Sequence, residues 1–183
     1  MFRAALGANL YLRILEERHS PAVFALVDRE RATLREWLPW VDVTKSEDDT
    51  LAFIRRSLEQ FSTNGGFAAG IWEQERFAGT IGLHKIDWLN RHGEIGYWLG
   101  REFQGRGIAT QACLAVTRHA LAEMQLNRLE IRCATANQRS KAIPRRLGYT
   151  YEGVARKASQ LHGEYVDLEV YSMLRAEFAQ VSV

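Results

Sequence analysis

The sequence predicts an α/β (α+β) fold in which helices flank a mixed, mostly antiparallel sheet of about seven strands. Two observations support this fold class. Segments of alternating or continuously apolar residues, typical of strands, are interspersed with segments whose apolar residues recur at helical spacing. Several expected strands adjoin around short polar turns, which indicates antiparallel hairpins, whereas the two strands joined by the longest helix are expected to be parallel. With 183 residues, we expect one domain over residues 1–183.

The first third of the chain predicts one strand followed by two helices. Residues 9–15 (NLYLRIL) alternate apolar and polar side chains and are expected to form the strand. Ser20 and Pro21 are typical of a helix start, with Ser20 as the N-cap and Pro21 at the first helical position. A second helix is expected to begin near Ser46, because the spacing from Ser46 to Asp49 resembles a capping box.

The rest of the chain predicts the remaining strands, one long helix and one short helix. The long helix is expected over about residues 107–124, with an apolar face at helical period, and the short helix is expected to end at Gly148. The expected strands cover residues 67–72, 77–86, 94–99, 129–135, 149–157 and 165–174.

Composition and charge argue against several classes of function. The chain has 24 Lys and Arg against 22 Asp and Glu, and a formal net charge of +2 predicts no nucleic-acid or membrane-surface partner. The longest apolar run near the N-terminus, residues 22–27, is too short for a signal peptide or a membrane span, so we expect a cytoplasmic protein. Cys113 and Cys133 occur without CxxC or Cys/His spacing, which predicts no metal site. The two could form one disulfide, but a reducing cytoplasm favours free thiols.

A glycine-rich turn between an expected strand and the long helix is the most informative segment. Gly105 and Gly107 let the backbone approach a ligand closely, and the first N–H groups of the helix lack intrahelical partners and carry partial positive charge. These properties suit a pyrophosphate. A Walker motif would need Lys and Ser or Thr where Arg106 and Gly107 stand, and a dinucleotide fingerprint would need a third glycine at Thr110. Alternatively, the glycines only shape the helix start.

Several motifs in register resemble one family of enzymes. The sequence QGRGIA at residues 104–109 resembles the Gln/Arg-x-x-Gly-x-Gly/Ala pattern of the GNAT acetyltransferases. Residues 94–99 (EIGYWL) and 110–112 resemble the Rim-type subgroup, which acetylates the N-termini of ribosomal proteins. The Asn-x-x-Ser and Leu-Gly-aromatic sequences at residues 137–140 and 147–149 are similar to that subgroup as well. The resemblance extends over nearly the whole chain and implies the GNAT fold.

This resemblance implies acetyl-coenzyme A as the acetyl donor, without a metal, and a protein N-terminal amine as the acceptor. The strand at residues 97–99 would pair its backbone with the pantetheine arm, because in this family it splays from the strand at residues 129–135. The residues implied in coenzyme binding are Tyr97, Trp98, Leu99, Gln104, Gly105, Arg106, Gly107, Ile108, Ala109, Thr110 and Asn137.

Acetyl transfer needs a neutral amine, a polarised carbonyl and a proton for the departing thiolate. Many GNAT enzymes protonate the sulfur with a tyrosine at the position of Pro144, so the resemblance leaves Ser140 for this role. Ser140 could equally cap the short helix, with Pro144 in its first turn. Glu94 is the candidate base, acting on the amine directly or through water, and the alternative is a glutamate at a sheet edge facing solvent. Asp167 and Glu169 are more distant candidates.

Two other functions remain open at this point: acetylation of a small amine such as a polyamine or an antibiotic, and a catalytically silent sensor of acyl-coenzyme A. His84 is expected on a strand near the cleft, where a surface or hydrogen-bonded histidine is the commoner explanation. The side chains of Trp37, Trp40 and Trp88 could line an acceptor pocket, but they favour packing in the core or at a dimer contact. The exposed-looking aromatic residues in the first third of the chain, together with the resemblance, predict a homodimer.

Overall fold

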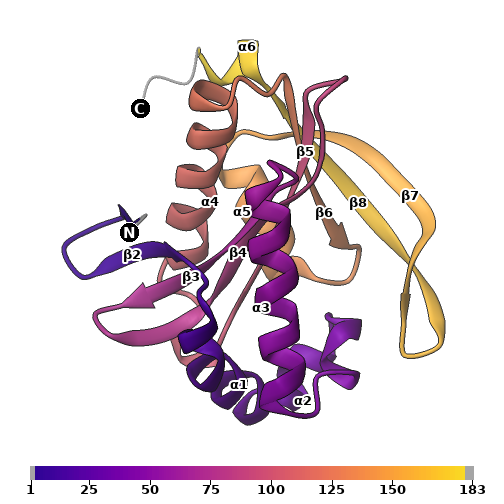
Figure 1. Cartoon of the computed structure of the whole chain (residues 1–183). Helices are drawn as coiled ribbons and strands as arrows, with labels where there is room; N and C mark the ends of the chain where they lie inside the picture. Colours follow the sequence, from indigo (N-terminus) through magenta and orange to yellow (C-terminus); the bar gives the residue numbers. More distant parts are fainter. Residues whose placement is uncertain (1–2, 180–183) are drawn as a thin grey trace.

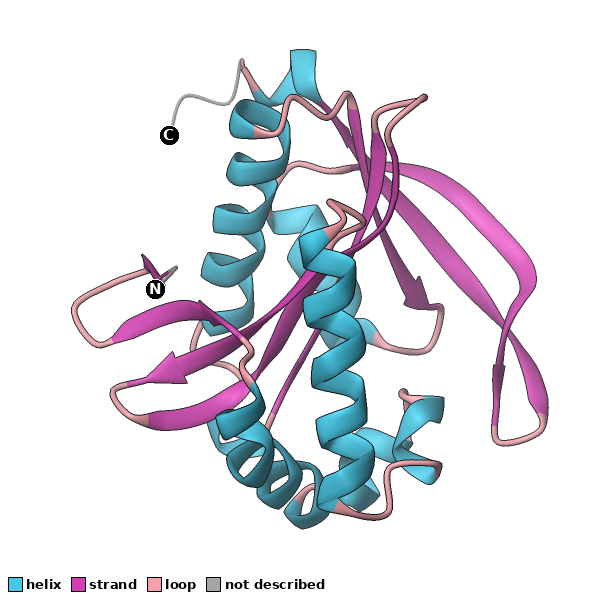
Figure 2. Cartoon of the chain, viewed as in Figure 1, coloured by secondary structure: helices cyan, strands magenta, loops and turns pink. Residues whose placement is uncertain are grey.

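The computed structural model describes residues 3–179 and consists of one twisted sheet with helices on both faces (Figures 1 and 2). The strand order is β1-β2-β3-β4-β5-β6-β8-β7, and every neighbouring pair is antiparallel except β5 and β6. The strands are β1 (Arg3–Ala5), β2 (Leu10–Ile14), β3 (Phe67–Glu73), β4 (Arg76–Asp87), β5 (His92–Leu99), β6 (Arg128–Ala134), β7 (Thr150–Leu161) and β8 (Glu164–Leu174). This confirms the predicted fold class. The added strand, β1, has only three residues, too few for a recognisable alternation.

Helices from the two halves of the chain cover opposite faces of the sheet (Figure 2). The helices are α1 (Ser20–Arg29), α2 (Arg31–Arg35), α3 (Glu47–Ser62), α4 (Ile108–Arg118), α5 (Gln138–Arg146) and α6 (Arg175–Phe178). The apolar side chains of α1, α2 and α3 form one core cluster, and those of α4 and α5 belong to the other. A short π-helical segment, η4 (His119–Glu123), continues α4 and accounts for the predicted length of the long helix.

The sequence predicted N-cap residues for α1 and α3, of which the one for α3 is confirmed and the one for α1 is wrong. At α3, the Asp49 backbone N–H donates to Ser46 Oγ at 3.3 Å and the Ser46 N–H donates to Asp49 Oδ2 at 2.9 Å, which confirms the capping box. At α1, His19 occupies the cap position and Ser20 is already helical, so the predicted Ser20 N-cap is wrong by one residue. The Ser20 hydroxyl donates instead to the Glu47 carbonyl at 3.1 Å, and this bond joins α1 to α3.

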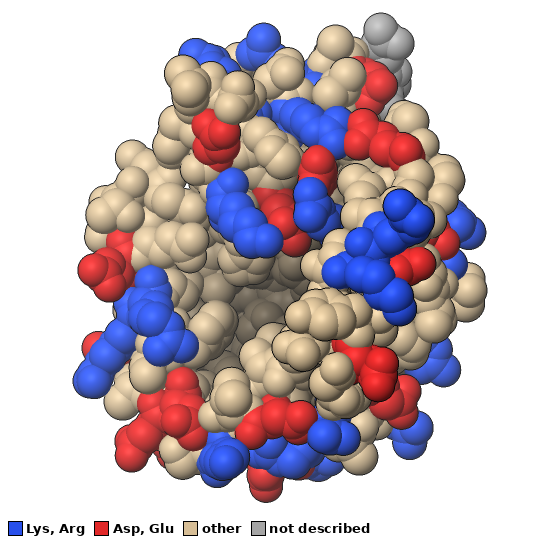
Figure 3. Space-filling model, turned by 90° about the vertical axis from the view of Figure 1, so that its right-hand side faces the viewer, with Lys and Arg blue, Asp and Glu red and all other residues tan. Residues whose placement is uncertain are grey.

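The β7–β8 hairpin extends well beyond the rest of the sheet (Figure 1). Its turn contacts the last residue of α2 and the segment that follows it. The ring of His162 lies 2.5 Å from the Arg35 carbonyl oxygen and 3.5 Å from a carboxylate oxygen of Asp42. From the side of this hairpin, the molecule has a central hollow surrounded by basic and acidic side chains (Figure 3). Within residues 3–179, no helix combines the length and apolar character needed to cross a bilayer.

Candidate active site

Strands β5 and β6 separate in the middle of the sheet. Residues 92–94 of β5 pair with residues 128–130 of β6, and no pairing follows beyond them. β5 continues beside β4 as far as Leu99, and β6 continues beside β8 as far as Ala134. The edge of β5 that faces β6 therefore lacks a strand partner over residues 95–99, and an extended ligand can add to it. We call this opening the fork.

The glycine-rich turn lies between the end of β5 and the start of α4. Gly105 and Gly107 have φ angles of +73° and +76°, in the left-handed region that favours glycine. Gly107 is the N-cap residue of α4, and no side chain caps the helix. A Cβ atom on Gly105 would meet nothing within 4 Å, so the space beside the turn is open. The turn therefore offers unpaired helix N–H groups to a ligand, as a pyrophosphate site requires.

The side chains of this turn are mostly engaged within the protein. The Gln104 amide donates to the Leu99 carbonyl at 2.9 Å, and the Arg106 guanidinium forms an ion pair with Glu73. Ile108 is buried in the core. The predicted binding residues of the turn can thus serve a ligand mainly through their backbone.

Two arginines of α5 contact the turn, and the sequence analysis did not predict them. Arg139 Nη1 donates to Gln104 Oε1 at 2.9 Å, and Arg146 Nη1 donates to Thr110 Oγ1 at 2.9 Å. Thr110 and Ala109 are half-buried in the first turn of α4. The two guanidinium groups add positive charge beside the open backbone, which favours a phosphate ligand. Because 35 residues separate Arg139 from Gln104, no local spacing links them.

Neighbouring residues of β5 point to opposite faces of the sheet. Trp98 packs against Trp40 and Phe77, with ring centroids 5.8 and 6.0 Å away, on the face covered by α1–α3. Tyr97 points to the other face, where its hydroxyl donates to the Ser140 carbonyl at 3.0 Å. Trp40 therefore packs within the protein, as the packing interpretation of the tryptophans expected.

Ser140 bridges the two diverging strands from the first turn of α5. Its Oγ lies 3.1 Å from Cys133 Sγ on β6 and 3.4 Å from the Tyr97 hydroxyl on β5. Burial raises the pKa of Tyr97 and also the pKa of the Cys133 thiol, so both groups are protonated at neutral pH. Both cysteines are free thiols, as predicted. The fork therefore contains a cluster of neutral O–H and S–H donors.

Asn137, not Ser140, caps α5. Asn137 Oδ1 accepts the Ser140 N–H at 3.1 Å, so the interpretation of Ser140 as the cap is wrong. Pro144 lies inside α5 rather than in its first turn. A proline has no N–H to donate to the carbonyl four residues earlier, which here is that of Ser140. The Tyr97 hydroxyl takes the place of this missing donor.

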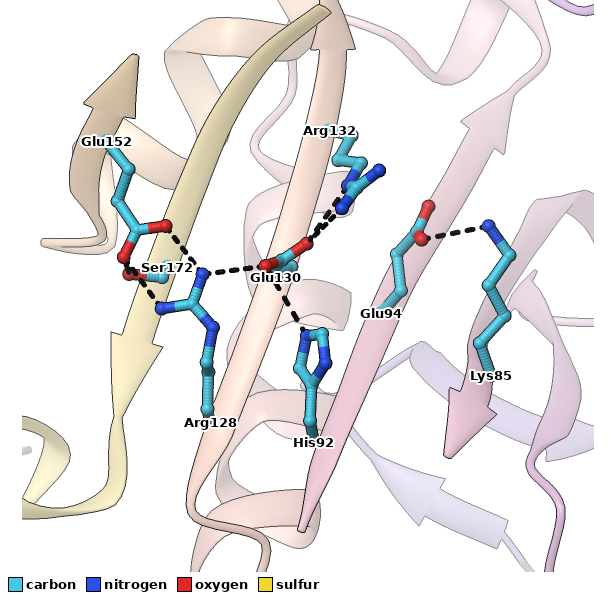
Figure 4. Close-up of polar contacts among 8 residues, drawn as sticks. All are labelled: Lys85, His92, Glu94, Arg128, Glu130, Arg132, Glu152 and Ser172. Carbon is cyan, nitrogen blue, oxygen red and sulfur yellow. Dashed lines mark hydrogen bonds and ion pairs between the residues drawn. The ribbon is translucent and has the colours of Figure 1, made fainter. Parts of the chain in front are cut away.

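Glu94 lies at the point where the fork opens. It is opposite His84 of β4 and beside Glu130 of β6. Its Oε2 accepts a hydrogen bond from Lys85 Nζ at 3.1 Å (Figure 4), and its side chain is 25% exposed. Because β5 is an interior strand, the interpretation of Glu94 as a solvent-facing glutamate at a sheet edge is wrong.

An ion network centred on the buried Glu130 lies beside Glu94 on the same face (Figure 4). Arg128 contacts Glu130 at 2.6 Å and Glu152 of β7 at 2.5 Å, and Arg132 donates to the other oxygen of Glu130 at 2.9 Å. The His92 ring lies 3.6 Å from Glu130. Burial alone would raise the pKa of Glu130, but the hydrogen bonds from the two arginines outweigh it and lower the pKa. The network joins β5, β6 and β7 where the fork begins.

Glu169 and Asp167, the two other candidate bases, accept hydrogen bonds from groups outside the fork. Glu169 accepts from Lys141 Nζ at 2.7 Å and from Arg145 Nη2 at 3.1 Å, and these bonds fasten α5 to β8. Asp167 Oδ1 accepts from the Lys157 backbone N–H at 2.8 Å. Glu169 is thus held by two cationic side chains, and one oxygen of Asp167 is engaged by the backbone. Over residues 3–179, no three His, Cys, Asp or Glu side chains are grouped to hold a metal ion.

Comparisons with known proteins identify the family. The family model of the acetyltransferase (GNAT) domain matches residues 9–150. YdaF of Bacillus subtilis (strain 168), whose name provisionally marks it as a ribosomal N-acetyltransferase, is 34% identical over 179 residues, which are 97% of this chain and 98% of YdaF. The ribosomal-protein-serine acetyltransferase of Escherichia coli (strain K12) is 28% identical over 169 residues, 92% of this chain and 94% of that protein.

A solved structure shows the same fold with the donor product bound. RimL, the ribosomal L7/L12 alpha-N-protein acetyltransferase, is 30% identical and has a TM-score of 0.91 in its complex with coenzyme A, over 94% of this chain and 98% of that chain. In that complex, a cysteine of RimL forms a disulfide with coenzyme A. The fold, the family match and these relatives agree. The chain belongs to the GNAT acetyltransferase family and is an N-acetyltransferase that uses acetyl-coenzyme A.

Proposed function

We propose that this protein transfers the acetyl group of acetyl-coenzyme A to the N-terminal amine of a protein, in the manner of the ribosomal-protein acetyltransferases. The observation that carries the proposal is the open edge of β5 at the fork, with Ser140 between the diverging strands and Glu94 where they part. The likeness to the Escherichia coli enzyme and to RimL supports the choice of acceptor.

The donor occupies the side of the sheet that carries α4 and α5. Its pyrophosphate binds the backbone N–H groups of residues 105–110, with Arg139 and Arg146 beside it. The pantetheine arm adds to the free edge of β5 along residues 97–99. Asn137 holds the first turn of α5 through its Oδ1, and its amide nitrogen remains available to the arm.

The acceptor enters from the opposite face, where Glu94 lies. Removal of a proton from its ammonium group, by Glu94 directly or through an intervening group, leaves a neutral amine that attacks the thioester carbon. Backbone N–H groups on the free edge of β5 polarise the carbonyl. The Ser140 hydroxyl then donates to the departing thiolate, because it lies between the two strands that enclose the sulfur end.

An acceptor screen that monitors the release of free coenzyme A tests this proposal. The acceptors are peptides that begin with serine or alanine, the same peptides with an acetylated N-terminus as matched controls, and spermidine. We expect turnover of the free peptides and none of the acetylated ones. Turnover of spermidine alone would replace the proposal with a small-amine acetyltransferase. Binding of acetyl-coenzyme A without turnover of any acceptor would indicate a silent sensor.

We also propose that the protein is one domain over residues 1–183, of which residues 1–2 and 180–183 lie outside the described part, and that it forms a homodimer. Large apolar side chains are exposed at Val43 (70%) and Tyr165 (58%), and Trp88 is 45% exposed. Such side chains are typical of surfaces that a second copy covers. Light scattering that reports a monomer at micromolar concentration would contradict the dimer. The cytoplasmic location stays a prediction.

A further inference from the structure

His84 lies on the acceptor face of the sheet, directly opposite Glu94 in the β4–β5 pairing. Two facing glycines, Gly82 and Gly96, leave the space that its ring occupies. A Cβ atom on Gly82 would lie 2.4 Å from His84 Cε1, and one on Gly96 would lie 3.4 Å from His84 Cδ2. Gly96 belongs to the free edge of β5, so the imidazole stands against the backbone that receives the thioester end of the donor.

The same imidazole lines a hollow between α3 and the sheet. The hollow has a volume of about 530 Å³, within the range of small-molecule binding pockets. Besides His84, its polar lining includes Arg56, Ser57, Glu59 and Gln60 of α3. No hydrogen bond engages the ring nitrogens of His84 among residues 3–179, which leaves them free for a ligand in this hollow.

The surroundings of His84 keep its imidazole neutral at neutral pH. Burial lowers the pKa of His84 below its ordinary value, whereas the nearby Glu94 carboxylate opposes this shift and Lys85 adds to it. Arg56 and Glu59, which face the hollow from α3, carry opposite charges. A neutral imidazole can accept a proton, and the carboxylate across the strand then stabilises the imidazolium that forms.

We propose that His84 is the group that accepts the proton from the acceptor's ammonium, and that Glu94 acts by stabilising the protonated imidazole. This inference rests on the proposed function and names the intervening group in its proton transfer. The ammonium gives one proton to His84, and the amine lone pair forms the C–N bond as the C–S bond breaks. The amine nitrogen then loses its second proton, which replaces the proton that the Ser140 hydroxyl gives to the departing thiolate. The thiolate takes up one proton, and His84 releases the other to solvent.

A histidine base also favours one class of amine. The α-amino group of a protein has a pKa of about 7.7–8.0, whereas an alkyl amine such as that of lysine has a pKa of about 10.4. Proton transfer to an imidazole with a pKa below its ordinary value is therefore less uphill from an α-amine. The site thus suits protein N-termini better than polyamines.

The test measures kcat for a serine-initiated peptide at saturating concentration as a function of pH, because kcat reports groups of the bound complex. In the wild type, kcat should fall as the pH drops through the pKa of His84. His84→Asn should lower kcat by about 10²-fold and remove this acidic limb, with unchanged affinity for acetyl-coenzyme A. Added imidazole should restore part of the rate of His84→Ala. The matched control is His119→Asn, since His119 pairs with Glu123 on η4 and should leave kcat unchanged.

Glu94→Gln separates the two candidate bases. If His84 is the base, this variant keeps the acidic limb and moves it to lower pH, because the carboxylate that raises the pKa of His84 is gone. If Glu94 takes the proton directly, the limb disappears in Glu94→Gln and persists in His84→Asn, which overturns the inference.

An unchanged kcat in folded His84→Asn overturns the inference as well, while turnover of the peptide by the wild type leaves the proposed function standing. If the His84 variants do not fold, the wild type is measured at several temperatures. The change of the apparent pKa of the acidic limb with temperature gives the ionisation enthalpy, which differs between an imidazole and a carboxyl group. An ionisation with the small enthalpy of a carboxyl group, rather than that of an imidazole, contradicts the inference.

Discussion

The two faces of the sheet at the fork are formed by different kinds of residues. We call the face that carries α4 and α5 the donor face, and the face covered by α1–α3 the acceptor face. On the donor face, the turn at residues 104–110 and the Asn137-x-x-Ser140 sequence are each a run of consecutive residues, and the turn offers mainly backbone N–H groups. On the acceptor face, His84, Glu94 and Glu130 come from three strands, and the proposed proton transfer uses the side chains of His84 and Glu94. A ligand site formed by backbone groups needs particular residue types at consecutive positions, so it leaves a local sequence motif. A function assembled across strands constrains residues that are far apart in the sequence, and it leaves no local pattern.

The largest effect is expected on the donor face from Gly107→Val. The φ angle of +76° strains a β-branched residue, and its side chain would project beside the N–H groups offered to the pyrophosphate. We expect binding of acetyl-coenzyme A, measured by calorimetry, to be abolished. Gly148→Val is the matched control, because Gly148 has a φ of +78° with open space around it and lies outside the turn. Equal losses of binding in both folded variants would remove the turn from the coenzyme site.

Ser140→Ala should affect the reaction rather than binding. The hydroxyl interacts with the sulfur only as negative charge develops, so kcat should fall by about 10²-fold with nearly unchanged affinity for acetyl-coenzyme A. Because Asn137 caps α5, Ser140→Ala should change the melting temperature little. Asn137→Ala should instead cost about 1 kcal/mol of stability. A stable Ser140→Ala variant with the wild-type kcat would exclude Ser140 from the mechanism.

The residues of the donor face were easier to predict from the sequence than those of the acceptor face, because they form local motifs. The fold, the turn and the motif that contains Ser140 follow from local periodicity and from a resemblance carried by contiguous residues. The cap at Asn137 and the place of Pro144 inside α5 needed coordinates, since either residue of an Asn-x-x-Ser motif can cap a helix. The pairing of His84 with Glu94 depends on the register of β4 and β5, which a bulge between His84 and Asp87 shifts.

A smaller effect is expected from Tyr97→Phe, which sharpens the comparison within the donor face. This change leaves the Ser140 carbonyl without a donor, because Pro144 has no N–H to supply. The lost hydrogen bond costs about 1 kcal/mol of stability and leaves Ser140 less well positioned for the thiolate, so kcat should fall by less than in Ser140→Ala. Pro144→Ala restores the helical donor, and the double variant Tyr97→Phe/Pro144→Ala should regain most of the rate. A double variant as slow as Tyr97→Phe would show that the carbonyl contact does not position Ser140.

The smallest effect is expected at Glu152. This residue is the exposed end of the ion network around Glu130, which joins β5, β6 and β7. The Arg128 hydrogen bond, with help from Ser172, lowers the pKa of Glu152 to about 2 from its ordinary 4.5. As the pH falls, the unfolded chain therefore binds this proton first. The stabilisation is full above pH 4.5, declines toward pH 2 and is absent below it.

Glu152→Gln removes this contribution and should lower the free energy of unfolding at pH 7 by no more than about 1 kcal/mol. The bound is low because the Glu152 side chain is 37% exposed and solvent screens its ion pair with Arg128. Urea unfolding of both proteins at several pH values measures the difference, which should shrink below pH 4.5, while the affinity for acetyl-coenzyme A stays the same. A difference that persists undiminished toward pH 2 would mean that Glu152 stabilises through packing rather than charge. A loss of affinity for acetyl-coenzyme A in Glu152→Gln would mean that the ion network on the acceptor face also supports coenzyme binding on the donor face.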